Sequence, residues 1–249
     1  MSVTIKTVSS RKDFKTFARF ANRLYKGNKY YVPSMPMDDL STFSKEKNAA
    51  FEFSEAEFYL AYKDGEVAGR VAAIINHKAN DAWKVKQVRF GWIDFIDDLE
   101  VSAALLDAVI EFGRKAGMTQ IVGPLGFTDF DPEGMLVEGY DRLGTMALIY
   151  NHPYYPEHMK KHGYYKETGW LEYRITIPEM VSERHKRIAE AVMDRYGLII
   201  KKKTRSQIKK ERYGQKLFKL INETYCVLYG YSLLSEKQID QYVGLYLSL

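Results

Sequence analysis

The chain has 249 residues, of which 46% are hydrophobic and 14% aromatic, and its formal net charge at pH 7 is +5. This length and composition allow one large domain or two smaller ones with a substantial core, and they exclude a disordered chain. No apolar run approaches the length of a membrane span and no export signal follows residue 1, so we expect a cytoplasmic protein without a membrane partner. Cys226 is the only cysteine, which excludes an internal disulfide and favours a reducing compartment.

The first half of the chain predicts a mixed β-sheet with helices. Alternating apolar residues predict strands, an Asp-Gly pair predicts a hairpin turn, and apolar residues three or four apart predict helices. A strand, a crossover helix and a second strand imply a parallel pair, because only a crossover returns the chain in the same direction. In chain order we expect a strand at 4–8, helices at 12–25 and near Pro36, a hairpin at 58–76, a strand at 88–94, a helix ending at Gly117 and a strand at 119–124.

The second half of the chain predicts a loop, further elements and an internal repeat. The long loop at 123–144 is rich in turn residues, which is typical of a binding or lid element. We then expect a short helix ending at Gly163, a strand at 169–177, a helix at 182–195, a strand at 198–204, and helices at 211–228 and from Ser235. The last strand-helix-helix order repeats the first 46 residues, so we expect a domain at 1–178 and, at 179–249, a basic linker and the start of a second domain that is cut off. A helical extension packed on the first domain is the alternative.

Three stretches of the first domain follow one another as hairpin, helix and short helix. They are LAYKDGEVAGRVAAI at 60–74, LLDAVIEFGRKAGM at 105–118 and YN…HMKKHGYYKE at 150–167. With these motifs, residues 3–177 resemble the GNAT superfamily of acyl-CoA-dependent N-acyltransferases, and within it a group of uncharacterised bacterial proteins. The resemblance implies an α/β (mixed α+β) GNAT-like fold with a helical C-terminal extension, acetyl-CoA or another acyl-CoA as co-substrate, and, from the repeat, a double-GNAT protein.

The resemblance also implies where the acyl-CoA binds. Backbone N–H groups at the end of a splayed central strand, here 88–95, would polarise the thioester. The pyrophosphate would lie on the turn and helix start that follow, and an asparagine would lie near the pantetheine arm. The positions that match these cofactor-binding sites are Phe95, Ile96, Leu99, Glu100, Val101, Ser102 and Asn151.

The turn departs from the family's pattern of Arg or Gln, two residues, Gly, one residue, and Gly or Ala. Asp97, Glu100 and Ser102 stand where that pattern has its basic residue and its small residues. A carboxylate about 7 Å from a phosphate costs about 0.6 to 2.4 kcal/mol in effective dielectrics between about 80 and 20. We therefore expect a weakened acyl-CoA site, with Asp97 or Asp98 capping the helix.

Asp94, His158 and Tyr155 are the three candidates for proton transfer, and Tyr154 is a neighbour that could replace Tyr155. Asp94 lies within an apolar and aromatic strand, where an unpaired carboxylate is costly, and is the first choice as general base; pairing with Arg89 would make it structural instead. No tyrosine occupies the position from which the family protonates the leaving thiolate. His158 is a candidate for that acid, and Tyr154 and Tyr155, one turn earlier, compete for the role.

Other polar residues have two interpretations each. Asp129, Asp131 and Glu133 in the long loop are candidates for binding a cationic amine substrate, or they form turns. His158 and His162 have the spacing of zinc ligands, but no nearby Cys or Glu completes a site, so we expect no metal. Residues 184–219 contain 13 Lys or Arg and 3 Asp or Glu, which would suit an anionic partner or simply form a solvated helix face.

These observations lead to three hypotheses. The first is an acyl-CoA-dependent N-acyltransferase that moves an acyl group such as acetyl to a small-molecule or peptide amine. The second is a GNAT-fold module that has lost catalysis and binds a ligand or partner. The third is a Fem-like transferase that uses aminoacyl-tRNA, which the basic stretch would suit.

Overall fold

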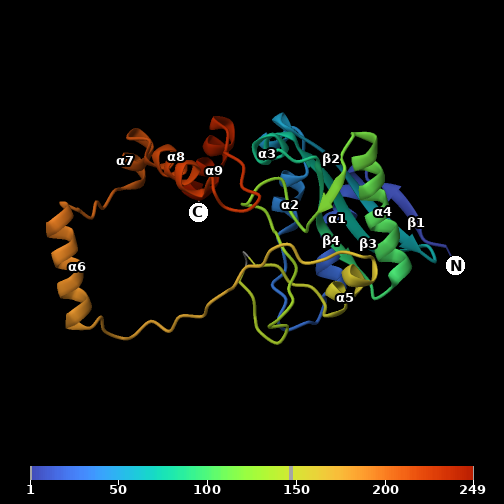
Figure 1. Cartoon of the computed structure of the whole chain (residues 1–249), viewed down its shortest axis with the longest axis horizontal. Helices are drawn as coiled ribbons and strands as arrows, with labels where there is room; N and C mark the ends of the chain where they lie inside the picture. The colour runs from blue at the N-terminus through green and yellow to red at the C-terminus, as the bar shows by residue number, and fades with distance from the viewer. Residues whose placement is uncertain (1, 146–147, 249) are drawn as a thin grey trace.

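The protein is built on a five-stranded mixed sheet in the order β1-β2-β3-β4-β5 (Figure 1). The structure, a computed structural model, describes residues 2–145 and 148–248. Antiparallel pairing joins the first four strands, and β4 and β5 pair in parallel. The predicted mixed α+β fold is therefore confirmed. The strands are β1 (Thr4–Thr7), β2 (Ser54–Lys63), β3 (Glu66–Asn76), β4 (Gln87–Phe95) and β5 (Gln120–Val122).

Helices cover both faces of the sheet. On one face lie α1 (Arg11–Leu24) and α2 (Pro36–Thr42), and on the other lie α4 (Leu99–Lys115) and α5 (Tyr154–Lys161). Ser10 begins α1 through a capping box with Asp13, which satisfies backbone N–H groups that the helix leaves unpaired. Phe17 of α1 packs edge-on against Phe58 of β2, while Leu105 of α4 is fully buried on the opposite face. The sheet thus has two apolar cores, one on each side.

The end of β4 is irregular and changes which residues of β3 and β4 lie opposite each other. Trp92 has a φ of 44°, and the register with β3 shifts by one residue, so that Arg70 pairs with Asp94 but Ala72 pairs with Gly91. A shift of this kind is a β-bulge, which re-aims the side chains that follow it. Pairing of β4 with β5 ends at Arg89 and Val122. The chain after β5 still lies against β4, because the Leu125 N–H donates to the Phe90 carbonyl at 2.9 Å and the rings of Trp92 and Phe127 are 6.0 Å apart, so the splayed strand that the resemblance implies stays a prediction.

Several predicted elements are wrong or were missed. The strands expected at 169–177 and 198–204 are not formed: in the described residues neither segment pairs with a sheet edge, and their apolar side chains are exposed. Alternation of apolar residues marks a chain suited to a sheet, but a strand also needs a neighbour. The sequence analysis did not predict the short helices η1 (Ala49–Glu52), α3 (His77–Trp83) and α7 (Arg205–Lys210).

The C-terminal part forms an arm and a small helical unit. The arm contains α6 (Glu183–Tyr196), and the unit contains α8 (Tyr213–Tyr225) and α9 (Glu236–Ser248), as predicted. Phe218, Leu234 and Ile239 make a separate small core between these two helices. The division into domains at 178 stays a prediction. Among the described residues, no helix is long and apolar enough to cross a membrane.

Candidate functional site

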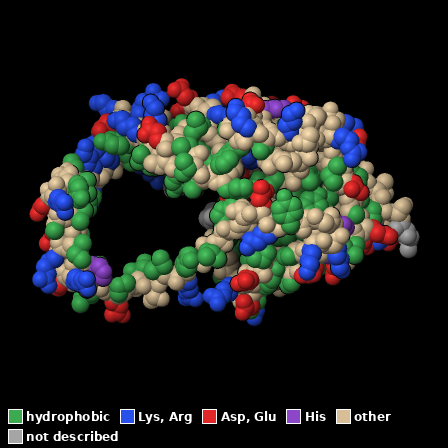
Figure 2. All heavy atoms as spheres, in the orientation of Figure 1, with side chains coloured by type: hydrophobic (Ala, Val, Ile, Leu, Met, Phe, Trp, Pro, Cys, Tyr) green, Lys and Arg blue, Asp and Glu red, His purple; other side chains and the backbone are tan. Residues whose placement is uncertain are grey.

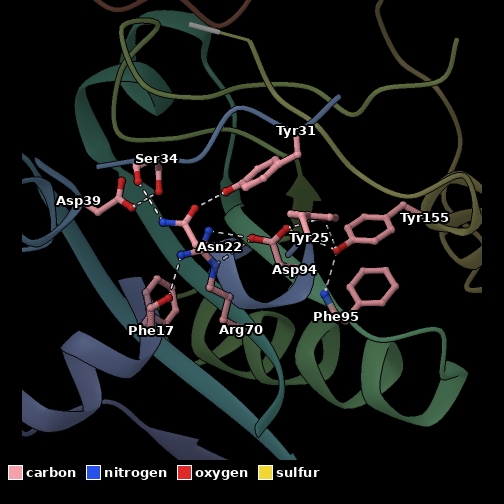
Figure 3. A network of polar contacts seen from close by, with 10 residues as sticks. All are labelled: Phe17, Asn22, Tyr25, Tyr31, Ser34, Asp39, Arg70, Asp94, Phe95 and Tyr155. Atoms are coloured by element: carbon pink, nitrogen blue, oxygen red, sulfur yellow. Dashed lines mark hydrogen bonds and ion pairs between the residues drawn. The ribbon is translucent and has the colours of Figure 1, made fainter. Parts of the chain in front are cut away.

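A buried network of polar side chains surrounds Asp94 at the end of β4 (Figure 3). Arg70 of β3 contacts Asp94 Oδ2 through Nε at 2.8 Å and through its terminal nitrogen at 2.7 Å. The Tyr25 hydroxyl donates to Asp94 Oδ1 at 2.8 Å and lies 2.8 Å from the hydroxyl of Tyr155. The Tyr155 hydroxyl is 3.4 Å from Asp94 Oδ1. One carboxylate is therefore joined to an arginine on one side and to a pair of tyrosines on the other.

Burial sets the proton affinity of this network. It raises the pKa of Asp94 above its ordinary value, and the Arg70 charge opposes that rise. Burial and the Asp94 charge raise the pKa of both Tyr25 and Tyr155 well above the ordinary value, so both hydroxyls keep their protons. A carboxylate of raised pKa beside two protonated hydroxyls can store and return a proton.

The partner of Asp94 is Arg70, not Arg89 as the sequence analysis considered. Arg89 is also buried, but its guanidinium donates to the carbonyls of Gly126 and Gly230 at 3.1 and 3.2 Å. The bulge at Trp92 explains the difference, because it changes which side chains of β4 lie beside those of β3. The ion pair makes Asp94 structural in part, while its raised pKa leaves it suited to proton transfer.

Two tyrosines of α5 form hydrogen bonds with the backbone of Phe95. The Phe95 N–H donates to the Tyr155 hydroxyl at 3.0 Å, and the Tyr154 hydroxyl donates to the Phe95 carbonyl at 2.6 Å. The Tyr155 ring also stacks on the Phe95 ring, with centroids 4.2 Å apart. The N–H group that the resemblance assigns to the thioester oxygen is therefore held by a hydroxyl of the protein itself. Tyr155, proposed as an acid, lies beside that N–H.

His158 is held away from this network. Its Nε2 lies 3.0 Å from Asp97 Oδ1 and its Nδ1 lies 2.9 Å from the Ser102 hydroxyl. His162 contacts the same hydroxyl at 2.8 Å. Both ring nitrogens of the buried His158 are thus engaged in positioning α5 against the start of α4. Of the three candidates for proton transfer, Asp94 and Tyr155 are brought together and His158 is not.

The start of α4 is closed by the side chain of Asp98. Asp98 Oδ1 accepts from the backbone N–H groups of Glu100 and Val101 at 2.9 and 3.3 Å, and Oδ2 pairs with Lys63. Lys63 also contacts Glu100 at 3.1 Å. The capping prediction is confirmed for Asp98, whereas Asp97 turns to His158. A carboxylate therefore fills the place where a helix would receive a phosphate.

The remaining positions at this turn do not complete a pyrophosphate site. Ile96 and Leu99 are exposed, Val101 belongs to the core, and Ser102 is fully buried with its hydroxyl bound to histidines. As the side chains stand, the residues at the start of α4 do not fit the pyrophosphate of a coenzyme A. Phe95, at the end of β4, is buried, with the ring of Tyr155 stacked on it and its backbone hydrogen-bonded to Tyr154 and Tyr155.

Asn151 has a different role from the expected one. An asparagine that opens α5 would stand directly before the helix, but α5 begins at Tyr154 and Pro153 is its N-cap residue. The Asn151 side chain accepts from the Leu136 N–H at 2.7 Å and donates to the Leu136 carbonyl at 3.1 Å. Asn151 therefore connects the long loop to the chain that leads into α5, and both polar atoms of its side chain form hydrogen bonds there.

The three loop acids lie around Arg89. Burial raises the pKa of Asp129 and Asp131 to about 6 and that of Glu133 to about 7, while the Arg89 charge opposes the rise in each. Asp131 also accepts from the Thr128 N–H at 3.0 Å, as a turn-forming acid does. The polar contacts of this group are therefore separate from those of Asp94.

Two further features bear on earlier expectations. In the part of the chain that the structure describes, no three His, Cys, Asp or Glu side chains are placed to hold a metal ion. The basic stretch 184–219 lies on α6, α7 and the beginning of α8, and Figure 2 shows Lys and Arg side chains at both ends of the arm.

Sequence reasoning missed three residues of the site. Tyr25, Arg70 and Lys63 come from distant parts of the chain and meet the β4–α4 region only in the fold. An arginine at position 70, in the middle of an apolar strand, was a usable signal, because a buried charge requires a partner. The tyrosine at the end of α1 gave no comparable signal.

The strand order and the parallel β4–β5 pair around α4 match what the motifs implied. The chain is GNAT-like in fold. No protein-family model matches it. It is 28% identical over 162 residues to Protein YghO of Escherichia coli, covering 65% of this chain and 41% of that protein. It is 23% identical over 242 residues to a bacterial ceramide synthase of Caulobacter vibrioides, covering 94% and 60%.

The chain thus spans less than two thirds of the length of these curated relatives. Among solved structures, a similar one is a predicted acetyltransferase of Clostridium acetobutylicum with acetyl-CoA, at a TM-score of 0.41 and 11% identity, covering 69% of this chain and 96% of that one. The relatives carry different names, so the site's own geometry is the main guide to function.

Proposed function

We propose that the protein is an N-acyltransferase that moves an acyl group from an acyl-CoA thioester to an amine at the end of β4. The observation that carries the proposal is the chain of contacts from Asp94 through Tyr25 to Tyr155, which ends at the Phe95 N–H. It places a proton store and an oxyanion donor within one group of residues. Acyl transfer to an amine requires both.

The chemistry follows from the order of these contacts. The amine nitrogen attacks the thioester carbon, and the Phe95 N–H, released by the Tyr155 hydroxyl, donates to the developing oxyanion. One proton leaves the nitrogen and passes through the hydroxyls of Tyr155 and Tyr25 to Asp94. When the carbon–sulfur bond breaks, the same proton returns along this path to the thiolate. The products are an amide and a free thiol, and Asp94 ends ionised.

The similarity to a bacterial ceramide synthase supports the acceptor class. A ceramide is an amide of a long-chain amino alcohol, so the name describes the formation of an N-acyl bond. We therefore propose a primary amine as the acceptor, with a long-chain amino alcohol as the first one to test. The loop acids Asp129, Asp131 and Glu133 would attract its ammonium group, although their raised pKa values limit their charge near neutral pH.

The closed start of α4 shapes the proposal for the donor. Asp98 pairs with Lys63 and accepts from the first N–H groups of α4. A pyrophosphate would therefore gain little binding energy at the start of this helix. We propose that the acyl chain and pantetheine arm beside Phe95 supply most of the donor's affinity, and that the nucleotide lies outside the α4 start.

The test is a transfer assay with acetyl-CoA and palmitoyl-CoA as donors and sphinganine, a long-chain amino alcohol, as acceptor. Free thiol release and the amide product are both measured, the second by mass spectrometry. We expect amide formation that Tyr155→Phe reduces about a hundredfold or more and Tyr154→Phe leaves nearly unchanged. Thiol release without amide, or equal loss in both variants, would contradict the proposal.

A second candidate is a GNAT-fold module that binds a ligand or partner without turnover. The observation that favours it is that both anion-binding positions, the Phe95 N–H and the α4 start, are filled by the protein's own Tyr155 and Asp98. Absence of heat on titration with millimolar acyl-CoA, together with absence of amide, would select this candidate. An anionic partner for residues 184–219, including tRNA, stays a further proposal of the same kind.

A further inference from the structure

The helix pair α8–α9 repeats the helix pair α1–α2 in its hydrogen bonds. The Asn22 amide donates to the Ser34 carbonyl at 3.0 Å, and the Tyr31 hydroxyl donates to Asn22 Oδ1 at 2.6 Å. The residues that stand 200 positions later make the same two hydrogen bonds. The Asn222 amide donates to the Leu234 carbonyl at 3.0 Å, and the Tyr231 hydroxyl donates to Asn222 Oδ1 at 2.8 Å. The same atoms thus fix the connection between the two helices in both pairs.

The repeat defines which face of α8 corresponds to the sheet-facing side of α1. Phe17, Phe20 and Tyr25 of α1 are 0%, 2% and 2% exposed. The corresponding residues of α8, again 200 positions later, are Leu217, Leu220 and Tyr225, which are 56%, 55% and 48% exposed. The second set is as apolar as the first, but nothing in the described structure covers it to the same extent.

The contacts of α8–α9 with the rest of the molecule leave this face open. The hydrogen bonds and ion pairs come from α9 and the connection before it: Gln241 Oε1 accepts from the Ala49 N–H, Lys237 pairs with Glu52, and the Trp83 indole donates to the Tyr231 carbonyl. The helix α8 contributes Phe218, whose ring lies 5.8 Å from that of Phe130 in the long loop. The unit is therefore attached beside the first sheet, next to α3 and η1, through residues other than Leu217, Leu220 and Tyr225, which stay exposed.

We propose that Leu217, Leu220 and Tyr225 form a docking surface for a second mixed β-sheet of the same kind as β2–β4. The interface would continue one that the molecule already contains, in which Phe17 of α1 packs on Phe58 and Tyr25 donates to Asp94. The Tyr225 hydroxyl would donate to a carboxylate in that second sheet. The relatives have length for such a sheet, since this chain spans 41% and 60% of them.

The experiment supplies such a sheet to the full chain. Residues 43–178 of the same sequence are appended after residue 249, so that α8–α9 precede a sheet as α1–α2 do. Hydrogen exchange of the α8 amides and oxidative footprinting of Leu217 and Leu220 are compared with the 249-residue chain. We expect exchange of α8 to slow about tenfold or more and both leucines to become protected.

Matched variants decide what covers the surface. In the extended chain, Leu217→Lys with Leu220→Lys should abolish the protection, whereas Lys219→Ala, on the same helix, should not. In the 249-residue chain, the double variant should leave the unfolding midpoint and the monomer mass unchanged. Unprotected leucines in the extended chain, whether or not the appended sheet folds, would overturn the proposal. So would a dimer of the 249-residue chain that the double variant dissociates, or a loss of its stability in that variant, because another occupant would then cover the face.

Discussion

Asp94 and Asp98 lie four residues apart, at the end of β4 and the start of α4, and their surroundings give them opposite properties. Asp94 is buried, and its pKa is raised by burial although Arg70 opposes the rise. Asp98 is only partly buried, and its pKa is lowered by Lys63 and by backbone N–H groups of α4. The first carboxylate is suited to take up a proton. The second is a fixed negative charge that replaces a bound anion.

In this GNAT-like fold both halves of the expected acyl-CoA site are filled by the protein's own groups, the Phe95 N–H by the Tyr155 hydroxyl and the α4 start by the Asp98 carboxylate. The half at Phe95 depends on the bulge in β4 and on the tyrosines of α5. The half at α4 depends on the side chains of the turn, which here are acidic. A substitution at either carboxylate should therefore disturb one half and spare the other.

The largest effect is expected for Asp94→Asn. This change leaves Arg70 buried without its counter-charge, which costs about 3 to 5 kcal/mol of the free energy of unfolding. Denaturant unfolding monitored by circular dichroism measures it. Adding Arg70→Met should restore much of the stability but no acyl transfer. A single variant that unfolds within about 1 kcal/mol of the parent chain would show that the pair does not hold this region together.

The next effect is expected for Tyr155→Phe. Loss of the hydroxyl removes the proton path between the amine and Asp94 and leaves the Phe95 N–H without its partner, so stability should fall by about 1 to 3 kcal/mol. Acyl transfer should fall about a hundredfold or more. Tyr154→Phe is the matched control because its hydroxyl contacts the Phe95 carbonyl and lies outside the path. Equal rates in the two variants would remove Tyr155 from the mechanism.

Asp98→Asn should change affinity more than stability. Asparagine caps a helix about as well as aspartate, so α4 should keep its start. Removing the charge, and freeing Lys63, should tighten acyl-CoA binding by about three- to fiftyfold, from the Coulomb energy of one carboxylate about 7 Å away. Calorimetry measures the change, with Asp107→Asn, farther along α4, as the control. Unchanged affinity would show that the Asp98 charge is not what keeps the pyrophosphate from the α4 start.

The smallest effect concerns a second group of carboxylates with raised pKa values. Glu133 has a pKa of about 7, and an unfolded carboxyl titrates near 4. The folded chain therefore binds this proton more tightly, and between about pH 4 and 7 the free energy of unfolding should fall as pH rises. In the parent chain we expect Glu133 to lower the free energy of unfolding by about 1 to 2 kcal/mol as the pH rises from 5 to 8. The Glu133→Gln variant should lack this fall. Parallel stability curves for the two proteins would contradict the raised pKa.

The sequence predicted local features better than distant partners. The capping carboxylate at the start of α4, the mixed sheet and Asp94 as a costly buried charge follow from local pattern and composition. Arg70 could not be assigned to Asp94, because the bulge that aligns them arises from the pairing of two strands, and Tyr25 could not, because it meets Asp94 only when α1 packs on the sheet. Residues 169–177 and 198–204 carry strand patterns without a neighbouring strand, and the opening asparagine Asn151 serves a loop instead.

The most direct test of the proposed donor binding is to compare the binding of palmitoyl-CoA with that of palmitoyl-pantetheine, which lacks the pyrophosphate and nucleotide. If Asp98 closes the α4 start and the acyl chain and pantetheine arm bind beside Phe95, calorimetry should give dissociation constants within about tenfold of each other. Palmitoyl-CoA binding about a hundredfold more tightly would contradict the account, because an open anion site would then be present. Absence of heat with both ligands at millimolar concentration would contradict it as well.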